Sequence, residues 1–253
     1  MPSKPSKPRW ERAAAVLLAL LVWQAAAAAL GSALLLVSPL RVLQRLSELA
    51  LEPQFYAAVG FSFVRIVAGF LLGLCCGTLL AAAASRWHLA EVLLWPYMTV
   101  IKTTPVASFI ILCLIWLDSS SLPVFISFLM VLPIVYANML EGIRQTDPKL
   151  LEMAGLFRAR AGRRLLYIYL PQLRPYLTTA CSVALGLSWK AGIAAEVIGI
   201  PSGSIGERLY EAKVYLSSAD LFAWTVVIIA VSIAFEKLFL WLLRVGYRRL
   251  ERL

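Results

Sequence analysis

Six long apolar runs constrain the fold of this chain more than any other feature of its sequence. An α-helix needs about 20 mostly apolar residues to cross a bilayer, and the runs are of that order. The composition agrees, since 61% of the residues are hydrophobic and 15% are charged, whereas soluble domains are about half apolar and a quarter charged. The sequence predicts an all-α integral membrane protein with six transmembrane helices, over about 13–37, 55–84, 92–117, 122–140, 175–198 and 219–243.

A chain this apolar cannot cover its surface with polar groups in water, which excludes a cytosolic enzyme, a disordered chain and a secreted disulfide scaffold. The formal net charge of +10 lies mostly between the apolar runs, so it favours a membrane-orientation signal and no nucleic-acid partner. No metal site is expected, because there is one histidine and no zinc or CxxC spacing. We expect the cysteines to be small buried hydrophobes, at Cys75, Cys76, Cys113 and Cys181.

The N-terminal region predicts three segments. Residues 1–12 alternate Pro, Ser and Lys without an apolar face, so we expect a disordered cytosolic tail before a single transmembrane domain over 13–253. The first apolar run is longer than the core of about 7–15 residues in a cleaved signal peptide, although the alanines at 25–29 keep cleavage open as an alternative. Residues 39–54 mix leucines and charges in a pattern typical of an amphipathic helix at the interface.

Basic residues predict the orientation of the spans. Sixteen of the 24 Lys and Arg residues lie in the tail, the 85–91 turn, the 141–174 loop and the C-terminus, whereas four lie in the remaining loops. Cytoplasmic segments carry the excess of basic residues. We therefore expect a multi-pass membrane protein with both termini in the cytoplasm.

Two further segments have recognisable packing signals. Gly69, Gly73 and Gly77 repeat every four residues in the second span, and this small-xxx-small spacing lets another helix approach closely. In the 141–174 loop, Asp147 and Pro148 are typical of a helix start, and a second helix is expected between Gly162 and Pro171. This helix-turn-helix has no catalytic set of residues, so we expect it to be a docking surface.

The stretch from Glu152 to Pro171 resembles the EAA loop of ABC importer permeases. The family pattern is E-A-A, three residues, G and a stretch ending in L-P; here Met153 replaces the first alanine, and Arg158 stands where the family usually has glycine. Other stretches resemble the nitrate/taurine/sulfonate branch of this family over about residues 40–245. They are LLWP at 93–96, KTTPVA at 102–107 and GLSWKAGIAAEVIG at 186–199.

The resemblance implies a type I ABC importer permease fold, a bacterial-type cell (inner) membrane location and a set of partners. Two permease chains pair, most simply as a homodimer, a dimer of cytosolic ATPases docks under the loops, and an extracytoplasmic binding protein delivers the substrate. This chain has no G-x-x-x-x-G-K-[ST] loop, so we expect no cofactor on it, with ATP and Mg on the ATPase. The implied ATPase-coupling residues are Glu152, Met153, Ala154, Gly155, Leu156, Phe157, Arg158 and Gly162.

Ionisable residues within the spans are functional candidates, because an unpaired charge at the helix centre costs at least about 2.5–3.5 kcal/mol. Pro105 should kink the third span. Lys190 and Glu196 are not neighbours on an unbroken helix, so a break near Gly192 or a pair between Glu196 and Lys102 are open alternatives. We expect a substrate pathway lined by Arg65, Lys102, Thr103, Thr104, Lys190 and Glu196, with helix packing as the alternative role.

The predicted function is ATP-driven uptake of a small solute by alternating access, with this chain as a transport subunit and not an enzyme. The residues within the spans have a small positive excess, which favours an anionic, sulfonate- or nitrate-like solute. A self-contained secondary transporter is the alternative, but the internal repeats that such proteins usually show are not seen. An intramembrane enzyme would need converging acid, base or nucleophile groups, which the spans lack.

Overall fold

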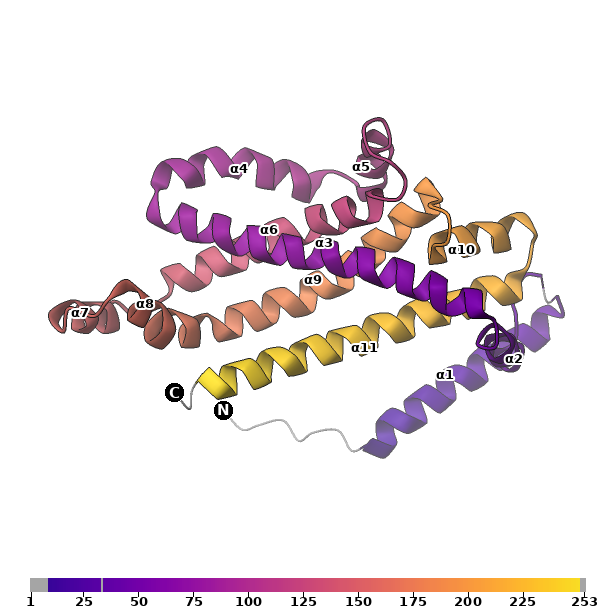
Figure 1. The fold of residues 1–253 in the computed structure, drawn as a ribbon. Coiled ribbons are helices and arrows are strands. Elements are labelled where there is room, and N and C mark those ends of the chain that lie inside the picture. The colour runs from indigo at the N-terminus through magenta and orange to yellow at the C-terminus, as the bar shows by residue number, and fades with distance from the viewer. Residues whose placement is uncertain (1–8, 33, 251–253) are drawn as a thin grey trace. The chain divides into compact units, whose positions relative to one another are not determined.

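The computed structural model describes residues 9–32 and 34–250, and all regular structure in these ranges is helical (Figure 1). Residues 1–8 of the predicted tail therefore lie outside the described part. The helices are α1 (Arg9–Leu30), α2 (Pro39–Leu49), α3 (Pro53–Arg86), α4 (His88–Thr103), α5 (Val106–Cys113), α6 (Leu122–Arg144), α7 (Pro148–Leu156), α8 (Ala161–Arg164), the π-helical turn η1 (Leu165–Tyr169), α9 (Leu170–Gly199), α10 (Ile205–Val214) and α11 (Ser218–Leu250).

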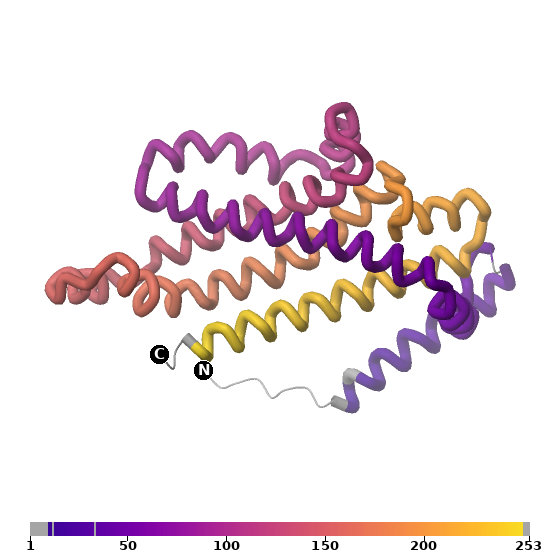
Figure 2. Tube along the Cα trace, in the orientation of Figure 1, coloured from indigo at the N-terminus to yellow at the C-terminus, as the bar shows by residue number. Residues whose placement is uncertain are grey.

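Five of the described helical stretches are long and apolar enough to cross a membrane. They are Ala13–Leu30, Pro53–Arg86, Leu122–Arg144, Ala161–Gly199 and Ser218–Arg249. The pair α4 and α5, which meet at an angle of 104°, raises the number to six if the pair forms one span. The six predicted apolar runs thus all fall on helices, and the helices of the third run are visibly turned against each other in the Cα trace (Figure 2).

Three helix ends differ from the expected ones for local backbone reasons. The first helix ends at Leu30 because Gly31 has a left-handed φ of 62°, a common helix stop. The third run breaks fully at Pro105, since the residue before a proline avoids helical geometry and Thr104 has ψ 130°. The expected stop at Pro171 is wrong, because the chain continues as helix from Ala161 to Gly199. The wide turn η1 ends at Tyr169, two residues before this proline, which occupies the first turn of α9.

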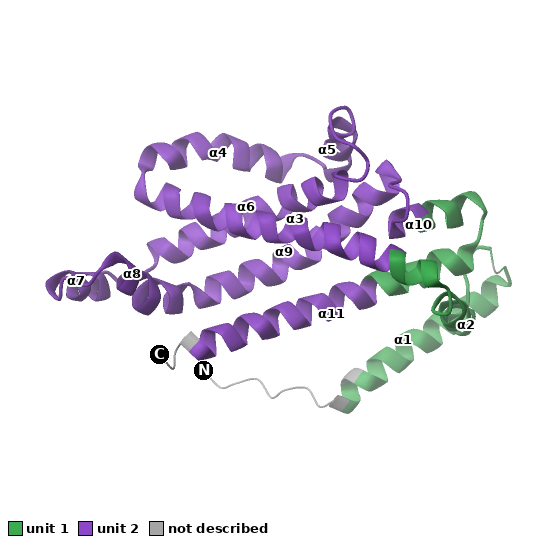
Figure 3. Cartoon of the chain, viewed as in Figure 1, with its two compact units in different colours: residues 1–57, 208–228 green, residues 58–207, 229–253 purple. Residues whose placement is uncertain are grey.

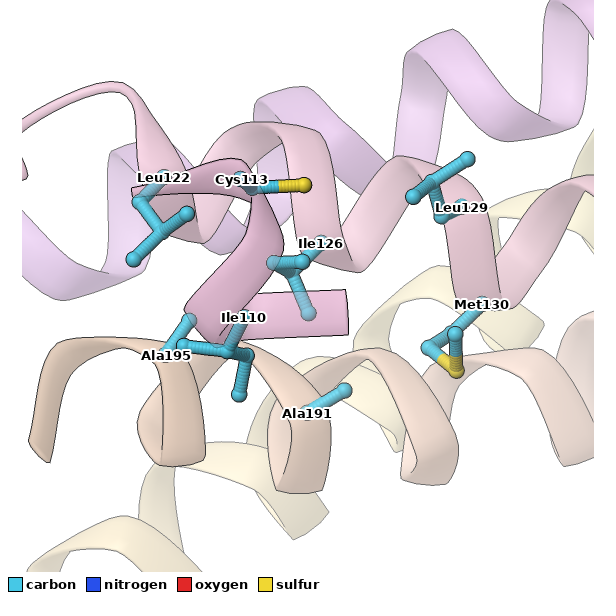
Figure 4. Packing of buried hydrophobic residues seen from close by; sticks show 8 residues of the cluster. All are labelled: Ile110, Cys113, Leu122, Ile126, Leu129, Met130, Ala191 and Ala195. Atoms are coloured by element: carbon cyan, nitrogen blue, oxygen red, sulfur yellow. The ribbon is translucent and has the colours of Figure 1, made fainter. Parts of the chain in front are cut away.

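The chain divides into two compact units (Figure 3). Unit 2, residues 58–207 and 229–253, contains α6, α9 and most of the other long helices. Its core is a cluster of buried side chains from α5, α6 and α9 (Figure 4). The labelled members are Ile110, Cys113, Leu122, Ile126, Leu129, Met130, Ala191 and Ala195.

The glycine repeat of α3 meets α6 within unit 2. A Cβ on Gly73 would lie 2.7 Å from the Cβ of Val131, and one on Gly77 would lie 2.9 Å from the Cβ of Val135. Only a residue without a side chain fits at these crossings, as the four-residue spacing predicted. The prediction for the cysteines is only partly right, since Cys113 and Cys181 are buried and Cys75 is exposed.

Unit 1, residues 1–57 and 208–228, contains polar contacts that join its two chain segments. Arg45 of α2 is paired with Glu48 and with Asp220 of α11, and these two hydrogen-bonded carboxylates raise the pKa of Arg45 above its usual value. Arg208 donates to Gln54 at 2.9 Å and pairs with Glu211 at 3.0 Å. The aromatic rings of Phe55 and Trp224 lie 5.2 Å apart between centroids.

Substitution of Gly73 by valine should destabilise the chain, because the new side chain overlaps Val131 and forces α3 away from α6. Overpacking of this kind costs about 1–3 kcal/mol, so we expect a clearly lower thermal midpoint in detergent. Gly60→Ala is the matched control on the same helix, since nothing lies within 4 Å of a Cβ there. Equal midpoints for the two variants would contradict the close α3–α6 crossing.

Candidate functional site

A cavity of about 250 Å³ with both apolar and charged lining residues lies between α4 and α6. At one end Arg144, in the last turn of α6, donates a hydrogen bond to Glu91 in the first turn of α4. Lys102, in the last turn of α4, also lines the cavity. The remaining lining residues are Trp95, Met98, Thr99, Tyr136, Ala137, Leu140 and Glu141. Because Glu91 already pairs with Arg144, Lys102 is the lining cation with no ion pair among the described residues.

The break between α4 and α5 carries the three polar residues that the sequence singled out. Lys102 and Thr103 are exposed, and Thr104 is half-buried. The Thr103 hydroxyl donates to the Thr99 carbonyl at 3.0 Å, and the Thr104 hydroxyl donates to the Val100 carbonyl at 2.8 Å. Both threonine hydroxyls are therefore hydrogen-bonded to carbonyls of α4, whereas the Lys102 ammonium has no hydrogen-bond partner among the described residues.

Lys190 is exposed on α9, although it lies among buried residues of the same helix such as Trp189 and Ala191. Arg65 on α3 has partners: its Nε donates to the Ser120 carbonyl at 2.7 Å, and its guanidinium carbon lies 3.3 Å from the centre of the Phe61 ring. Arg65 thus ties α3 to the turn before α6. Its role in the substrate pathway stays a prediction, whereas its role in joining α3 to this turn is observed.

Glu196 is the most enclosed of the candidate residues, with 0% exposure. Its Oε2 accepts a hydrogen bond from the Ser62 hydroxyl at 2.7 Å and another from the Gly206 amide at 3.1 Å. Ser62 in turn accepts from the Ile205 amide at 3.0 Å. The first amides of a helix have no partner within it, so Glu196 and Ser62 together cap the start of α10.

Two glycines make this cap sterically feasible. A Cβ on Gly206 would collide with the Cβ and backbone of Glu196, and one on Gly192 would lie 2.6 Å from Ile66 Cγ1. α9 runs through Gly192 without a break. The structure therefore brings Glu196 together with Ser62, and forms neither the Lys190–Glu196 pair nor the Lys102–Glu196 pair among the described residues. Glu196 Oε1 has no hydrogen-bond partner among them.

The helix expected in the 141–174 loop is α7, and the cap predicted at Asp147 is confirmed, since its side chain accepts from the Lys149 amide at 2.9 Å. Ala154 is buried and Glu152 is exposed. Leu156 and Phe157 are 85% and 80% exposed, which leaves an apolar tip at the end of α7. Nothing lies within 4 Å of a Cβ on Gly155 or on Gly162.

The turn after α7 is closed by the backbone. Arg158 has a left-handed φ of 49°, a conformation that favours glycine. This is the position where the family pattern has glycine and this chain has arginine. The Ala159 amide bonds the Ala154 carbonyl at 2.9 Å, and Arg164 Nε donates to the Ala159 carbonyl at 3.0 Å. Arg158 therefore adopts the turn conformation that a glycine would adopt there, at a cost in backbone strain.

Sequence reasoning missed the polar contacts of Arg45 and Arg208 in unit 1. They surround a cavity of about 160 Å³ whose lining also includes Glu52, Gln54, Tyr215, Ser217 and Asp220. Arg45 and Asp220 lie 175 positions apart in the chain, so no local pattern could have paired them. The amphipathic pattern of residues 39–54 and the charges around Arg208 were the available signals.

Comparison with known proteins gives a family and several relatives. The family profile described as "Binding-protein-dependent transport system inner membrane component" matches residues 69–252. The chain is 27% identical over 198 residues to a putative aliphatic sulfonates transport permease protein of Bacillus subtilis, covering 78% of this chain and 71% of the relative. It is 29% identical over 121 residues to a bicarbonate transport system permease protein of Synechococcus elongatus, covering 48% of this chain and 44% of the relative. It is 27% identical over 152 residues to a nitrate import permease protein of the same species, covering 60% and 54%.

Replacement of Glu196 by alanine should loosen the start of α10, because it leaves the Ser62 hydroxyl and the Gly206 amide without an acceptor. Each buried unsatisfied group costs about 1–3 kcal/mol. We expect a lower thermal midpoint and faster hydrogen exchange of amides in 203–214, whereas Glu196→Gln, which keeps an acceptor oxygen, should stay close to wild type. The matched control is Glu236→Ala, since Glu236 is half-buried and accepts one bond, from Ser182 at 3.1 Å. Unchanged exchange in Glu196→Ala would refute the capping role.

Proposed function

Since the chain belongs to the family of binding-protein-dependent transport system inner membrane components, it is the permease subunit of an ABC importer, and we propose that it forms half of an uptake path for a small anion. The observation that carries this proposal is the exposure of Lys102 and Lys190 on apolar helices. Charged groups at span depth normally face a water-filled cavity or another protein chain and not lipid. A homodimer enclosing an aqueous path would give both lysines that setting.

The relatives support an anion as the solute. Their names refer to aliphatic sulfonates, bicarbonate and nitrate, each of which carries negative charge near neutral pH. In this chain, Lys102 lines the α4–α6 cavity without an ion pair in the described structure, so its ammonium is free to neutralise such a solute. Hydrogen bonds to charged groups contribute about 1.5–3 kcal/mol, which is enough to favour an anion over a neutral solute of the same shape.

The loop around α7 is proposed to receive the force of ATP hydrolysis. Leu156 and Phe157 form an exposed apolar tip, and such a tip next to polar surroundings marks a protein-interaction site. A pair of separate ATPase chains, which hold ATP and Mg, would take this tip into a groove. The coupling residues are Glu152 to Arg158 and Gly162, with Gly155 leaving room for close approach of the ATPase backbone.

The proposed orientation places α7 and both termini in the cytoplasm of a bacterial inner membrane, because the basic residues concentrate in those segments. Segments 39–54 and 199–218 then face the opposite side. We infer that an extracytoplasmic binding protein delivers the anion there, where the ion pairs of Arg45 and Arg208 present a fixed polar surface. ATP binding and hydrolysis would then switch the paired permeases between outward- and inward-facing states.

Substitution of Gly155 by tryptophan should prevent ATPase docking and leave the permease folded, because the side chain enters open space in this chain. Co-purification of the ATPase with the tagged permease measures docking, and the thermal midpoint checks the fold. Gly246→Trp is the control, since Gly246 also has nothing within 4 Å of a Cβ and lies on α11 outside the loop. Normal co-purification and normal substrate-stimulated ATP hydrolysis in Gly155→Trp would remove α7 as the coupling element.

Neutral substitution of Lys102 or Lys190 should reduce uptake, because each removes a positive charge from the proposed path. Loss of about 1.5–3 kcal/mol of interaction predicts a tenfold to hundredfold fall in uptake of the transported anion by the complete importer. Lys237→Ala is the control, since Lys237 is also exposed at the last third of a span. The assay uses labelled sulfonate, nitrate and bicarbonate in turn, and wild-type uptake by both lysine variants would overturn the path.

A further inference from the structure

An apolar groove of about 700 Å³ lies in unit 2 between the end of α3, the turn η1 with the start of α9, and the end of α11. None of the described residues that line it is charged. Cys75 is among them, which explains why this cysteine is exposed and not buried. The lining residues are Leu71, Leu74, Cys75, Thr78, Leu79, Ala82, Ser85, Met139, Ile143, Leu165, Tyr169, Leu170, Leu173, Leu177 and Tyr247.

The groove changes in polarity along its length. Along α3 its lining runs from Leu71 and Leu74 to Ser85 near the end of the helix, and Tyr169 and Tyr247 line it as well. The stretch from Leu71 to Ser85 corresponds to about 21 Å of helix rise at about 1.5 Å per residue. One leaflet of the hydrocarbon core is about 15 Å thick, half of the whole. The groove is therefore long enough for an extended acyl chain, with tyrosines where membrane proteins place them at the interface.

Arginines directly follow three of the residues that line the groove, and one of them contacts a lining side chain. Arg86 follows Ser85, Arg174 follows Leu173, and Arg248 follows Tyr247. The guanidinium carbon of Arg174 lies 5.8 Å from the centre of the Tyr247 ring, which fixes this arginine at the groove. Arg86 and Arg248 are exposed. An apolar channel with a basic rim complements a molecule that has an apolar chain and an anionic head.

We propose that this groove binds an anionic phospholipid, with one acyl chain along α3 and the phosphate headgroup at the arginine rim. Basic pockets between transmembrane helices recognise such headgroups. A second copy of the permease is the less suitable occupant, because the same end of every copy carries the same arginines and the approach would add like charge. The site does not depend on which solute is transported.

The test uses the full chain in phosphatidylcholine nanodiscs that contain a small fraction of a lipid with a photoreactive acyl chain, either phosphatidylglycerol or phosphatidylcholine. Cross-linked peptides are mapped by mass spectrometry. We expect peptides around Leu74 and Leu173 to be labelled at least severalfold more by the phosphatidylglycerol probe. Each basic residue at a membrane surface contributes roughly fivefold in affinity for anionic lipid, so Arg86→Gln with Arg248→Gln should remove most of the preference.

Two controls separate the groove from the general lipid surface. Leu74→Trp fills the groove and should abolish labelling of its peptides, whereas Leu238→Trp, at an exposed position outside the groove, should not. Arg41→Gln removes the same charge from an exposed position in α2 and should leave the preference intact. Equal labelling by the two lipids, or protein-to-protein cross-links from the groove of one copy to another, would overturn the proposal. Uptake is not read in this assay, so its failure would leave the transport function standing.

Discussion

Hydrocarbon offers no hydrogen bonds, and this constraint decides where most polar groups in the spans of the chain find their partners. Most hydroxyls are satisfied within their own helix, as when Thr78 donates to the Leu74 carbonyl at 2.7 Å. A few are satisfied between helices, as when Ser127 donates to the Ser188 carbonyl at 3.1 Å. Lys102 and Lys190 follow neither pattern. Their lack of a described partner is what separates candidate transport residues from residues that serve the fold.

The fold also requires helices to pack closely, and small residues permit this close packing. Gly73 and Gly77 let α3 touch α6, Gly192 lets α9 touch Ile66 of α3, and Gly206 brings the start of α10 onto Glu196. Backbones this close place hydrogen-bonding groups within reach across helices. The cap made by Ser62 and Glu196 therefore depends on the glycines as much as on its own polar atoms. A larger side chain at any of these glycines would push the helices apart and so lengthen hydrogen bonds between them, without any change in charge.

The sequence predicted elements well and partners poorly, for physical reasons. Apolar length reveals a span, and Asp147 with Pro148 reveals a helix start, because both signals are local. The glycine repeat reveals that something packs on α3, but nothing in its spacing identifies α6. Ser62 and Glu196 lie 134 positions apart, so their bond follows from the assembled fold alone. The expected stop at Pro171 failed because this proline lies in the first turn of α9, just after the wide turn η1, where a proline is tolerated.

The continuous helix from Ala161 to Gly199 gives the coupling proposal a mechanical basis. Its 39 residues span about 58 Å at about 1.5 Å per residue, from the turn below α7 to the residues beside the cap of α10. Arg164 bonds carbonyls of the α7 turn at one end, and Glu196 holds α10 at the other. A displacement of α7 by an ATPase would therefore reach Lys190 and the cap of α10 along one continuous helical stretch. The hydrogen-bond pattern of this helical stretch changes at the π-helical turn Leu165–Tyr169. The stiffness of this turn therefore determines how much of a displacement of α7 is transmitted to Lys190.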